Sequence, residues 1–152
     1  FINDGQSGFL KEITFGEKES ETRSVAVADV NKDGWPDILT GNLGGKNVLY
    51  LGAKDFQFSQ IIAVGEARNT RSVQLVDFNQ DGWLDIAEGN DEAINYVYLN
   101  DAHMNFKEIP LNIDLNEDTY HLAVGDLNSD GLPDIVESNS GGMNLFYMTR
   151  KN

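Results

Sequence analysis

The sequence has no cysteine and few basic residues, prolines or histidines. Without cysteine there can be no disulfide, zinc–thiolate site or thiol chemistry. Only 11 Lys and Arg stand against 25 Asp and Glu, and the net charge is -14. This balance opposes nucleic-acid binding, because a phosphate backbone must be neutralised by Lys and Arg, and it opposes docking on an anionic membrane. No apolar run is long enough to span a membrane, so no membrane insertion is expected.

The chain is long enough for one ordinary domain. It has 152 residues, of which 40% are hydrophobic, so a core can form. Its acidic residues are clustered, which favours bound cations over solubility as the reason for the charge. The chain begins at Phe1 rather than Met, which indicates a processed or excised piece.

Three segments of the chain repeat one another. They start at Thr22, Thr70 and Thr119, so the spacing is 48 and then 49 residues. The segments read TRSVAVADVNKDGWPDILTGNLGGKN, TRSVQLVDFNQDGWLDIAEGNDEAIN and TYHLAVGDLNSDGLPDIVESNSGGMN. Such similarity predicts a repeat architecture.

Each repeat predicts four strands and no helix. Residues 24–28 alternate, with Val25 and Val27 on one face, which is the pattern of a strand. The second strands start at Asp37, Asp85 and Asp134. The third strands are aromatic and reach Tyr50, Tyr98 and Tyr147. The fourth strands carry, in register, Ile13, Ile61 and Ile109.

Four strands in just under 50 residues are more typical of a β-propeller blade than of a sandwich. The predicted fold is therefore an all-β propeller segment made of four-stranded blades. It forms one domain over residues 1–152, with blade repeats at about 9–51, 56–100 and 106–149. A strand within residues 1–15 is expected to complete a last blade.

An acidic loop of nine residues follows the first strand of each repeat. Asp at positions one, five and nine and Asn at position three offer side-chain oxygens, and position seven offers its backbone carbonyl. Glycine at position six allows a sharp turn with positive φ. Six or seven such oxygens suit Ca²⁺ better than Mg²⁺. The predicted ligands of three Ca²⁺ ions are Asp29, Asn31, Asp33, Trp35 and Asp37; Asp77, Asn79, Asp81, Trp83 and Asp85; and Asp126, Asn128, Asp130, Leu132 and Asp134.

These loops have two other interpretations. Asp, Asn and Gly are ordinary turn residues, but three loops with the same oxygen positions favour a metal. The EF-hand pattern matches two loops, with Glu88 and Glu137 at position twelve. Thr40 in the first loop, Pro36 and Pro133 at position eight, and the alternating flanks oppose it. Both glutamates are therefore interpreted as polar strand residues rather than ligands.

The loops DVNKDGWPD, DFNQDGWLD and DLNSDGLPD, each preceded by an alternating strand, resemble the FG-GAP/VCBS repeat family. These are calcium-binding propeller blades, also found in integrin α-chain heads. The resemblance implies that each loop joins the two innermost strands of a blade and that the positions given above hold the ion. Such propellers serve as adhesion modules, lectins and accessory domains of secreted enzymes. The chain departs from the family in having three repeats, fewer than a closed propeller has.

A segment of three blades would leave exposed sheet edges and apolar faces at its two ends. The opening residues 1–5 match the end of a third strand at Tyr98–Asp101, and residues from about Phe9 to Phe15 read as a fourth strand. The last repeat ends in its third strand, at residues 145–148. We therefore expect a homodimer in which each N-terminal strand completes the partner's last blade. The alternative is three blades cut from a longer propeller.

The rim opposite the loops repeats polar residues that could bind a glycan or protein ligand. They are Arg23, Asn42, Arg71, Asn90, Tyr120, His121 and Asn139. Asn can equally serve turns, and Arg can cap strand ends. Trp35 and Trp83 could be sugar platforms, although packing between blades is the more frequent role. His103 and His121 belong to no catalytic motif, so no enzyme is expected.

The sequence thus predicts an extracellular, non-catalytic binding or adhesion module, with carbohydrate as one ligand class. Ca²⁺ is expected to stabilise each blade by adding its binding free energy to folding. The alternative is a purely structural propeller segment or an accessory domain of a secreted enzyme.

Overall fold

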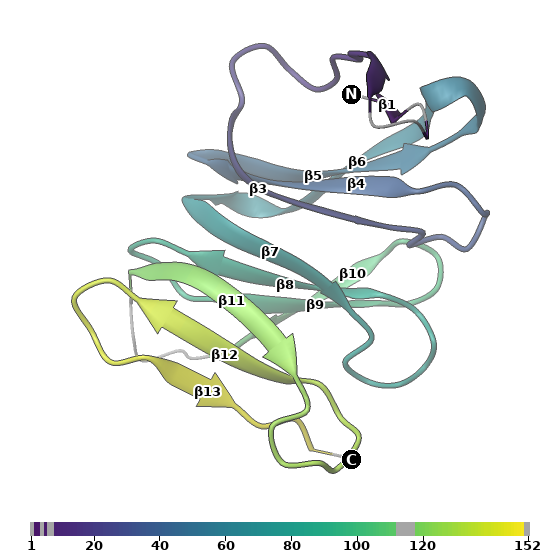
Figure 1. Ribbon diagram of the computed structural model, residues 1–152. Coiled ribbons are helices and arrows are strands. Elements are labelled where there is room, and N and C mark those ends of the chain that lie inside the picture. The colour runs from purple at the N-terminus through teal and green to yellow at the C-terminus, as the bar shows by residue number, and fades with distance from the viewer. Residues whose placement is uncertain (1, 4, 6–7, 112–117, 151–152) are drawn as a thin grey trace.

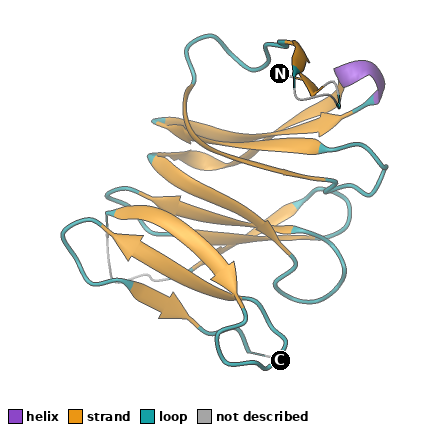
Figure 2. Ribbon diagram, in the orientation of Figure 1, coloured by secondary structure: helices purple, strands orange, loops and turns teal. Residues whose placement is uncertain are grey.

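A computed structural model of the chain describes residues 2–3, 5, 8–111 and 118–150. Its regular structure is nearly all strand, as the alternating patterns predict (Figure 2). Within these ranges one 3₁₀ turn, η1 (Lys54–Phe56), is the exception. No helix in the described ranges is long and apolar enough to cross a membrane.

Three antiparallel sheets lie one above another (Figure 1). The first contains β3 (Glu21–Ala28), β4 (Asp37–Leu43), β5 (Gly45–Gly52) and β6 (Phe58–Arg68). The second contains β7 (Thr70–Val76), β8 (Asp85–Asn90), β9 (Tyr96–Asn100) and β10 (Phe106–Pro110). The third contains β11 (Thr119–Gly125), β12 (Asp134–Asn139) and β13 (Leu145–Tyr147). In each sheet, every strand pairs with the next one along the chain.

The predicted order of strands is confirmed for the three sheets. Each second strand starts at the predicted Asp, and Ile61 and Ile109 lie in the fourth strands β6 and β10. The third sheet has three strands among the described residues, as expected for a repeat that ends in its third strand. Each fourth strand pairs with the third strand that precedes it, so the sheets span residues 21–68, 70–110 and 119–147 rather than the predicted repeat bounds.

The N-terminal prediction is corrected in part. The fourth strand predicted from about Phe9 to Phe15 is a strand only at β2 (Phe9–Lys11), so Ile13 lies beyond it. β2 pairs with the short strand β1 (Ile2–Asn3) and with none of the three sheets. A strand is defined only where a neighbour bonds to it, and β1 is too short to reach Ile13. Two residues of the predicted match to a third strand, Phe1 and Asp4, lie outside the described residues.

A hydrophobic core lies between each pair of neighbouring sheets. The first joins the first and second sheets through Val30, Leu39, Leu49, Leu51, Val64, Val73, Ile86 and Tyr98. The second joins the second and third sheets through Phe78, Ala87, Val97, Leu122 and Ile135. The first strands approach one another most closely, β3 against β7 and β7 against β11. The sheets therefore stack face on face along their first strands, and the stack remains open at both ends within the described part of the chain (Figure 1).

Candidate functional site

The three acidic loops connect the first and second strands of each sheet. Residues 29–37 join β3 to β4, residues 77–85 join β7 to β8, and residues 126–134 join β11 to β12. The glycine at position six has a positive φ in every loop, 90° at Gly34 and Gly82 and 84° at Gly131, as predicted. All three loops thus occupy the same place in their sheets.

Each loop is shaped by its own side-chain oxygens. In the first loop Asp29 accepts the backbone N–H of Asp33 at 3.1 Å and of Gly34 at 2.9 Å. Asn31 Oδ1 accepts the same Asp33 N–H at 3.0 Å, and Asp33 Oδ1 accepts the N–H of Trp35 at 2.8 Å. The same four bonds recur in the second and third loops. The oxygens of positions one and three therefore converge on one N–H group.

The aspartate at position nine has a second task that the sequence analysis missed. Asp37 is fully buried, and its carboxylate accepts the N–H of Val30 and the N–H of Gly52, each at 2.7 Å. Asp85 and Asp134 make the equivalent pairs of bonds. Each of these aspartates ties its loop to the end of the third strand. The signal in the sequence was their place at the first position of a buried strand.

Burial disfavours the charged form of two of these carboxylates, Asp37 and Asp85. It raises the pKa of Asp37, and it raises the pKa of Asp85 to about 6. The N–H groups of Phe78 and Asn100 oppose this rise, whereas the negative charges of Asp81 and Asp77 add to it. A cation close to the second loop would therefore stabilise the charged form of Asp85. It would offset both the desolvation of that carboxylate and its repulsion by Asp77 and Asp81.

The loops offer carboxylate and amide oxygens, which are the type of ligand that calcium takes. Within the described ranges, no three or more His, Cys, Asp or Glu side chains are grouped to hold a metal, because the loop carboxylates face their own N–H groups. Each of those oxygens accepts one bond and has a second lone pair left. Ca²⁺ takes six to eight oxygens in flexible geometry. The residues that would hold it in the first loop are Asp29, Asn31 and Asp33 on the exposed side, and Asp37 from within.

Neighbouring loops also contact each other. The Lys32 ammonium of the first loop lies 4.2 Å from the ring centroid of Trp83 in the second. Gln80 Nε2 in the second loop donates to the Gly131 carbonyl in the third at 2.6 Å. Trp35 is 43% exposed. Trp83 therefore packs against the neighbouring loop, whereas Trp35 is partly exposed.

Glu88 and Glu137 lie on strands and bond across the joints between sheets. Glu88 is fully buried and accepts Asn47 Nδ2 of the first sheet at 2.8 Å and Tyr98 Oη at 2.9 Å. Glu137 accepts Asn95 Nδ2 of the second sheet at 2.8 Å. Burial raises the pKa of Glu88 against the lowering effect of its hydrogen bonds. Both glutamates act as polar links inside the stack.

The rim residues predicted to bind a ligand fall into two groups. Asn42 and Asn90 are buried, and their side-chain amides donate to the carbonyls of Lys46 at 2.9 Å and Ile94 at 2.7 Å. Asn139 makes the equivalent bond to Met143 at 3.0 Å. These three asparagines hold the turns between second and third strands, which is the role that the sequence left open.

The other rim residues are at least partly exposed. Arg71 forms an ion pair with Asp91, and its guanidinium carbon lies 5.3 Å from the centroid of the Tyr120 ring. Arg23 lies 4.0 Å from the Glu21 carboxylate. His121 Nδ1 lies 3.3 Å from Ser72 Oγ, but Ser72 is fully buried. The structure thus brings Arg71 and Tyr120 together across two sheets.

Stacked antiparallel sheets that carry one acidic loop each, always between the first two strands, define an all-β repeat protein. In a comparison with protein families, the sequence model of the FG-GAP-like repeat matches residues 29–88 and 77–137. The two matches together cover more than half of the chain. The chain belongs to the FG-GAP-like repeat family. No match to a curated protein was found.

Proposed function

We propose that the chain is a calcium-stabilised segment of a β-propeller that acts as a non-catalytic binding module. The observation that carries this proposal is the threefold loop. The same residues, with the same internal hydrogen bonds, recur at the same place in each sheet. Ordinary turns need no such agreement in three separate sheets, whereas three equal cation sites do.

Calcium has a structural role in this proposal. One ion in each loop offsets two of the three carboxylate charges and joins the first strand of a sheet to the second. At a free calcium concentration one hundred times the dissociation constant, one site adds about 2.7 kcal/mol to the free energy of unfolding. Calcium is abundant outside cells, so we assign the protein to an extracellular location. The burial of Ser72 beside His121 supports a role without catalysis, because no substrate can reach that hydroxyl.

Thermal unfolding tests the calcium sites. The melting temperature is expected to fall when EDTA is added and to recover with Ca²⁺, but to recover poorly with Mg²⁺, because Mg²⁺ demands stricter geometry and retains its waters. For a chain of this size, one site at that saturation corresponds to a shift of roughly 5–11 °C. Differential scanning calorimetry measures it. Equal melting temperatures in EDTA and in millimolar Ca²⁺ would show that the loops are plain turns.

The rim around Arg71 and Tyr120 is the surface that we propose for ligand binding. The charge of Arg71 is already paired with Asp91, so an acidic ligand gains little there. The flat guanidinium and the exposed Tyr120 ring offer stacking surface to a neutral polyol, which favours a carbohydrate.

A glycan array tests the proposed rim. We expect a specific glycan to bind the unmodified chain, and Tyr120→Ala to abolish that binding without lowering the melting temperature. Tyr120 is 61% exposed, so its loss costs little packing. Met143→Ala, at a residue 81% exposed in a turn, is the matched control. If the unmodified chain binds no glycan, the alternative of a purely structural segment is favoured.

A further inference from the structure

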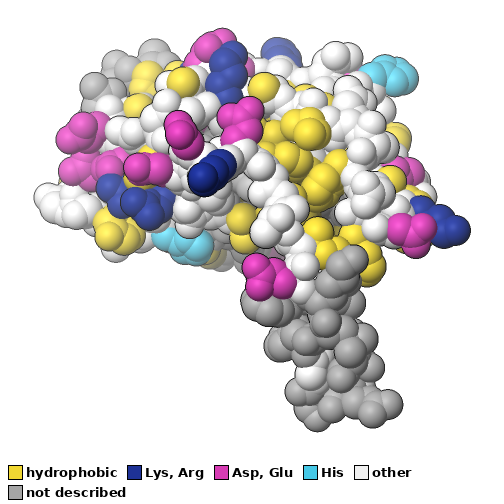
Figure 3. Space-filling view, turned by 90° about the horizontal axis from the view of Figure 1, so that it is seen from above, with side chains coloured by type: hydrophobic (Ala, Val, Ile, Leu, Met, Phe, Trp, Pro, Cys, Tyr) yellow, Lys and Arg dark blue, Asp and Glu magenta, His cyan; other side chains and the backbone are white. Residues whose placement is uncertain are grey.

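Both ends of the stack of sheets expose apolar side chains. On the first sheet, Val25, Val27 and Ile61 are 59%, 62% and 63% exposed. On the third sheet, Phe146 is 64% and Met148 is 39% exposed. Exposed apolar side chains gathered on one face usually mark an interaction surface. Figure 3 views the molecule from the end of the stack at which the first sheet lies, and it shows hydrophobic side chains gathered among charged ones.

The free face of the first sheet matches the faces by which the later sheets pack. Val25 pairs with Thr40 in the register, as Val73 pairs with Glu88 and Leu122 with Glu137. Val73 and Leu122 are only 1% and 0% exposed, because each packs against the preceding sheet. Val25 has the same place in its sheet, but among the described residues no preceding sheet packs against it.

The free face of the third sheet matches the opposite side of the same joint. Phe146 pairs with Val136, as Val97 pairs with Ala87 and Leu49 with Leu39. Leu49 and Val97 are buried against the following sheet. The two ends of the stack therefore carry the two complementary halves of a joint that the chain already forms twice.

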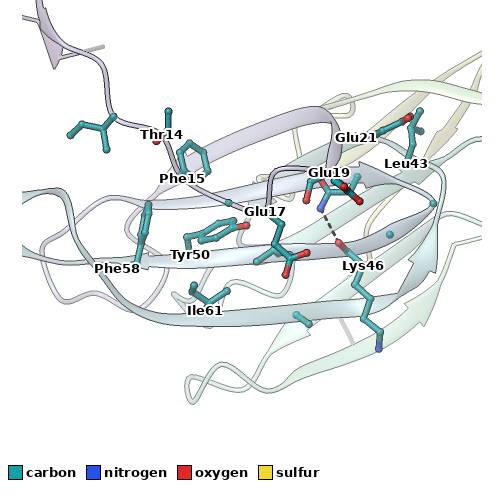
Figure 4. A pocket seen from close by; sticks show the side chains of 18 of the residues that line it. Thr14, Phe15, Glu17, Glu19, Glu21, Leu43, Lys46, Tyr50, Phe58 and Ile61 are labelled. Atoms are coloured by element: carbon teal, nitrogen blue, oxygen red, sulfur yellow. Dashed lines mark hydrogen bonds between the residues drawn. The ribbon is translucent and has the colours of Figure 1, made fainter.

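The N-terminal segment already lies where the fourth strand of a preceding sheet would lie. A Cβ on Gly16 would be 3.2 Å from Tyr50 Oη, and a Cβ on Gly65 in β6 would be 2.3 Å from Tyr98 Oη. Both glycines have positive φ, 83° and 66°. The Phe15 ring packs 5.3 Å from the Tyr50 ring between centroids (Figure 4). Within the described residues, no inner strands lie beside this segment, and no fourth strand lies beside β13.

A groove beside this segment leaves room on the free face. It has a volume of about 720 Å³ and lies between residues 13–21 and the strands β5 and β6. On this face the Phe15 ring packs on Tyr50 and Phe58. Val25 and Val27 on β3 and Ile61 on β6 stay exposed. The exposed part therefore includes β3, on which the inner strands of another sheet would pack.

We propose that two copies of this chain form a closed dimer, in which the third sheet of each packs on the first sheet of the other. β13 would then lie beside β2 of the partner and would replace β1 there. Two equal contacts related by a twofold axis close a ring of six sheets, within the range of four to eight that closed propellers have. The proposal rests on the sheet faces and does not depend on calcium.

One residue makes the proposed contact between two chains differ from the two contacts between sheets within one chain. Gly41 and Gly89 allow the next sheet to come close, since a Cβ on either would lie 2.9 Å from Val73 Cγ1 or Leu122 Cγ. In the third sheet the equivalent residue is Ser138, which pairs with His121 as Gly41 pairs with Ser24. Its expected neighbour in the partner is Val25. Ser138 therefore holds the two faces slightly apart, and Ser138→Gly should tighten the dimer.

Cysteine cross-linking tests the arrangement, because the chain has no cysteine of its own. The double variant Val25→Cys, Ser138→Cys should form a disulfide-linked dimer under oxidising conditions. Neither single variant should form this disulfide, because the two copies of Val25, or of Ser138, lie in different contacts of the dimer. Val25→Cys combined with Met143→Cys, in the exposed turn, is the control. A ladder of larger species, or equal linking of the control, would overturn the closed dimer.

Light scattering gives an independent test without any disulfide. A chain of 16.9 kDa should elute as a species of twice that mass. Phe146→Asp should give a folded monomer, because the ring is exposed in a single chain, and circular dichroism checks its fold. Ser138→Gly should lower the dimer dissociation constant about tenfold, which corresponds to about 1.4 kcal/mol. A monomer at all concentrations, or a dimer unaffected by Phe146→Asp, would overturn the proposal.

Discussion

Replacing Glu88 with alanine is expected to lower the free energy of unfolding by about 3–5 kcal/mol, the usual cost of removing one partner from a buried charged pair. The Glu88 carboxylate accepts from Asn47, Asn90 and Tyr98, and Arg68 lies 3.5 Å away. Its removal takes one acceptor from each of three buried donor groups, whereas the Arg68 guanidinium keeps Tyr98 and Glu108 as partners. Because Asn47 belongs to the first sheet, the joint between two sheets is weakened. Chemical denaturation followed by tryptophan fluorescence measures the loss.

The matched control removes the exposed partner of the same arginine. Glu108 lies 3.3 Å from Arg68 and its side chain is 39% exposed. Glu108→Ala should therefore cost no more than about 1 kcal/mol. Glu88→Thr is a second control, because Thr40 stands at this position in the first sheet; it should lose less than Glu88→Ala. Equal losses in Glu88→Ala and Glu108→Ala would show that the buried carboxylate adds nothing of its own.

The raised pKa of Glu88 also fixes the sign of its pH dependence. Burial makes the folded state hold the Glu88 proton more tightly than the unfolded state. Between the ordinary and the raised pKa the folded chain therefore binds more protons, and the contribution of Glu88 to stability falls as the pH rises through that window. In Glu88→Gln this fall should be absent, which a comparison of unfolding curves across the acidic range detects.

The repeat made most of the fold predictable. Alternation fixed the strands because a half-buried strand must place apolar residues at every second position. The acidic loops marked the start of each second strand, at Asp37, Asp85 and Asp134, to the residue. The count of three strands that the last sheet has within the described residues followed from the alignment alone. These features are local, so one sequence with three copies was enough to predict them.

Contacts between repeats could not be predicted in the same way. Asn42 and Asn90 recur on the rim, and recurrence alone does not tell an exposed amide from one that holds a turn. Ile13 has the pattern of a fourth strand but lacks the neighbouring strand that would make it one. The close approach at Gly41 and Gly89 depends on the distance between sheets, which no pattern within one repeat contains.

The aspartate at position nine has a structural role in the fold and a second, proposed role in the calcium site. The sequence assigned Asp85 to calcium because its oxygen lies at an alternate position of the loop. The structure gives it two buried N–H partners, Phe78 at 2.9 Å and Asn100 at 2.8 Å. Both roles use the same carboxylate, since each oxygen accepts more than one partner. Asp81, in contrast, is exposed and bonds only within the loop in the described part of the chain.

The two roles can be separated by comparing Asp85→Ala with Asp81→Ala. In EDTA, Asp85→Ala should lose about 2–6 kcal/mol, because two buried N–H groups at about 1–3 kcal/mol each lose their acceptor. Asp81→Ala should lose no more than about 1 kcal/mol there, because its partners can turn to water. In calcium, Asp81→Ala should bind two ions instead of three in isothermal titration and lose one loop's share of the calcium-dependent stability. If Asp81→Ala still binds as many ions as the unmodified chain, the exposed carboxylates of the loops hold no calcium. If Asp85→Ala is stable in EDTA, the link between loop and third strand contributes little to the fold.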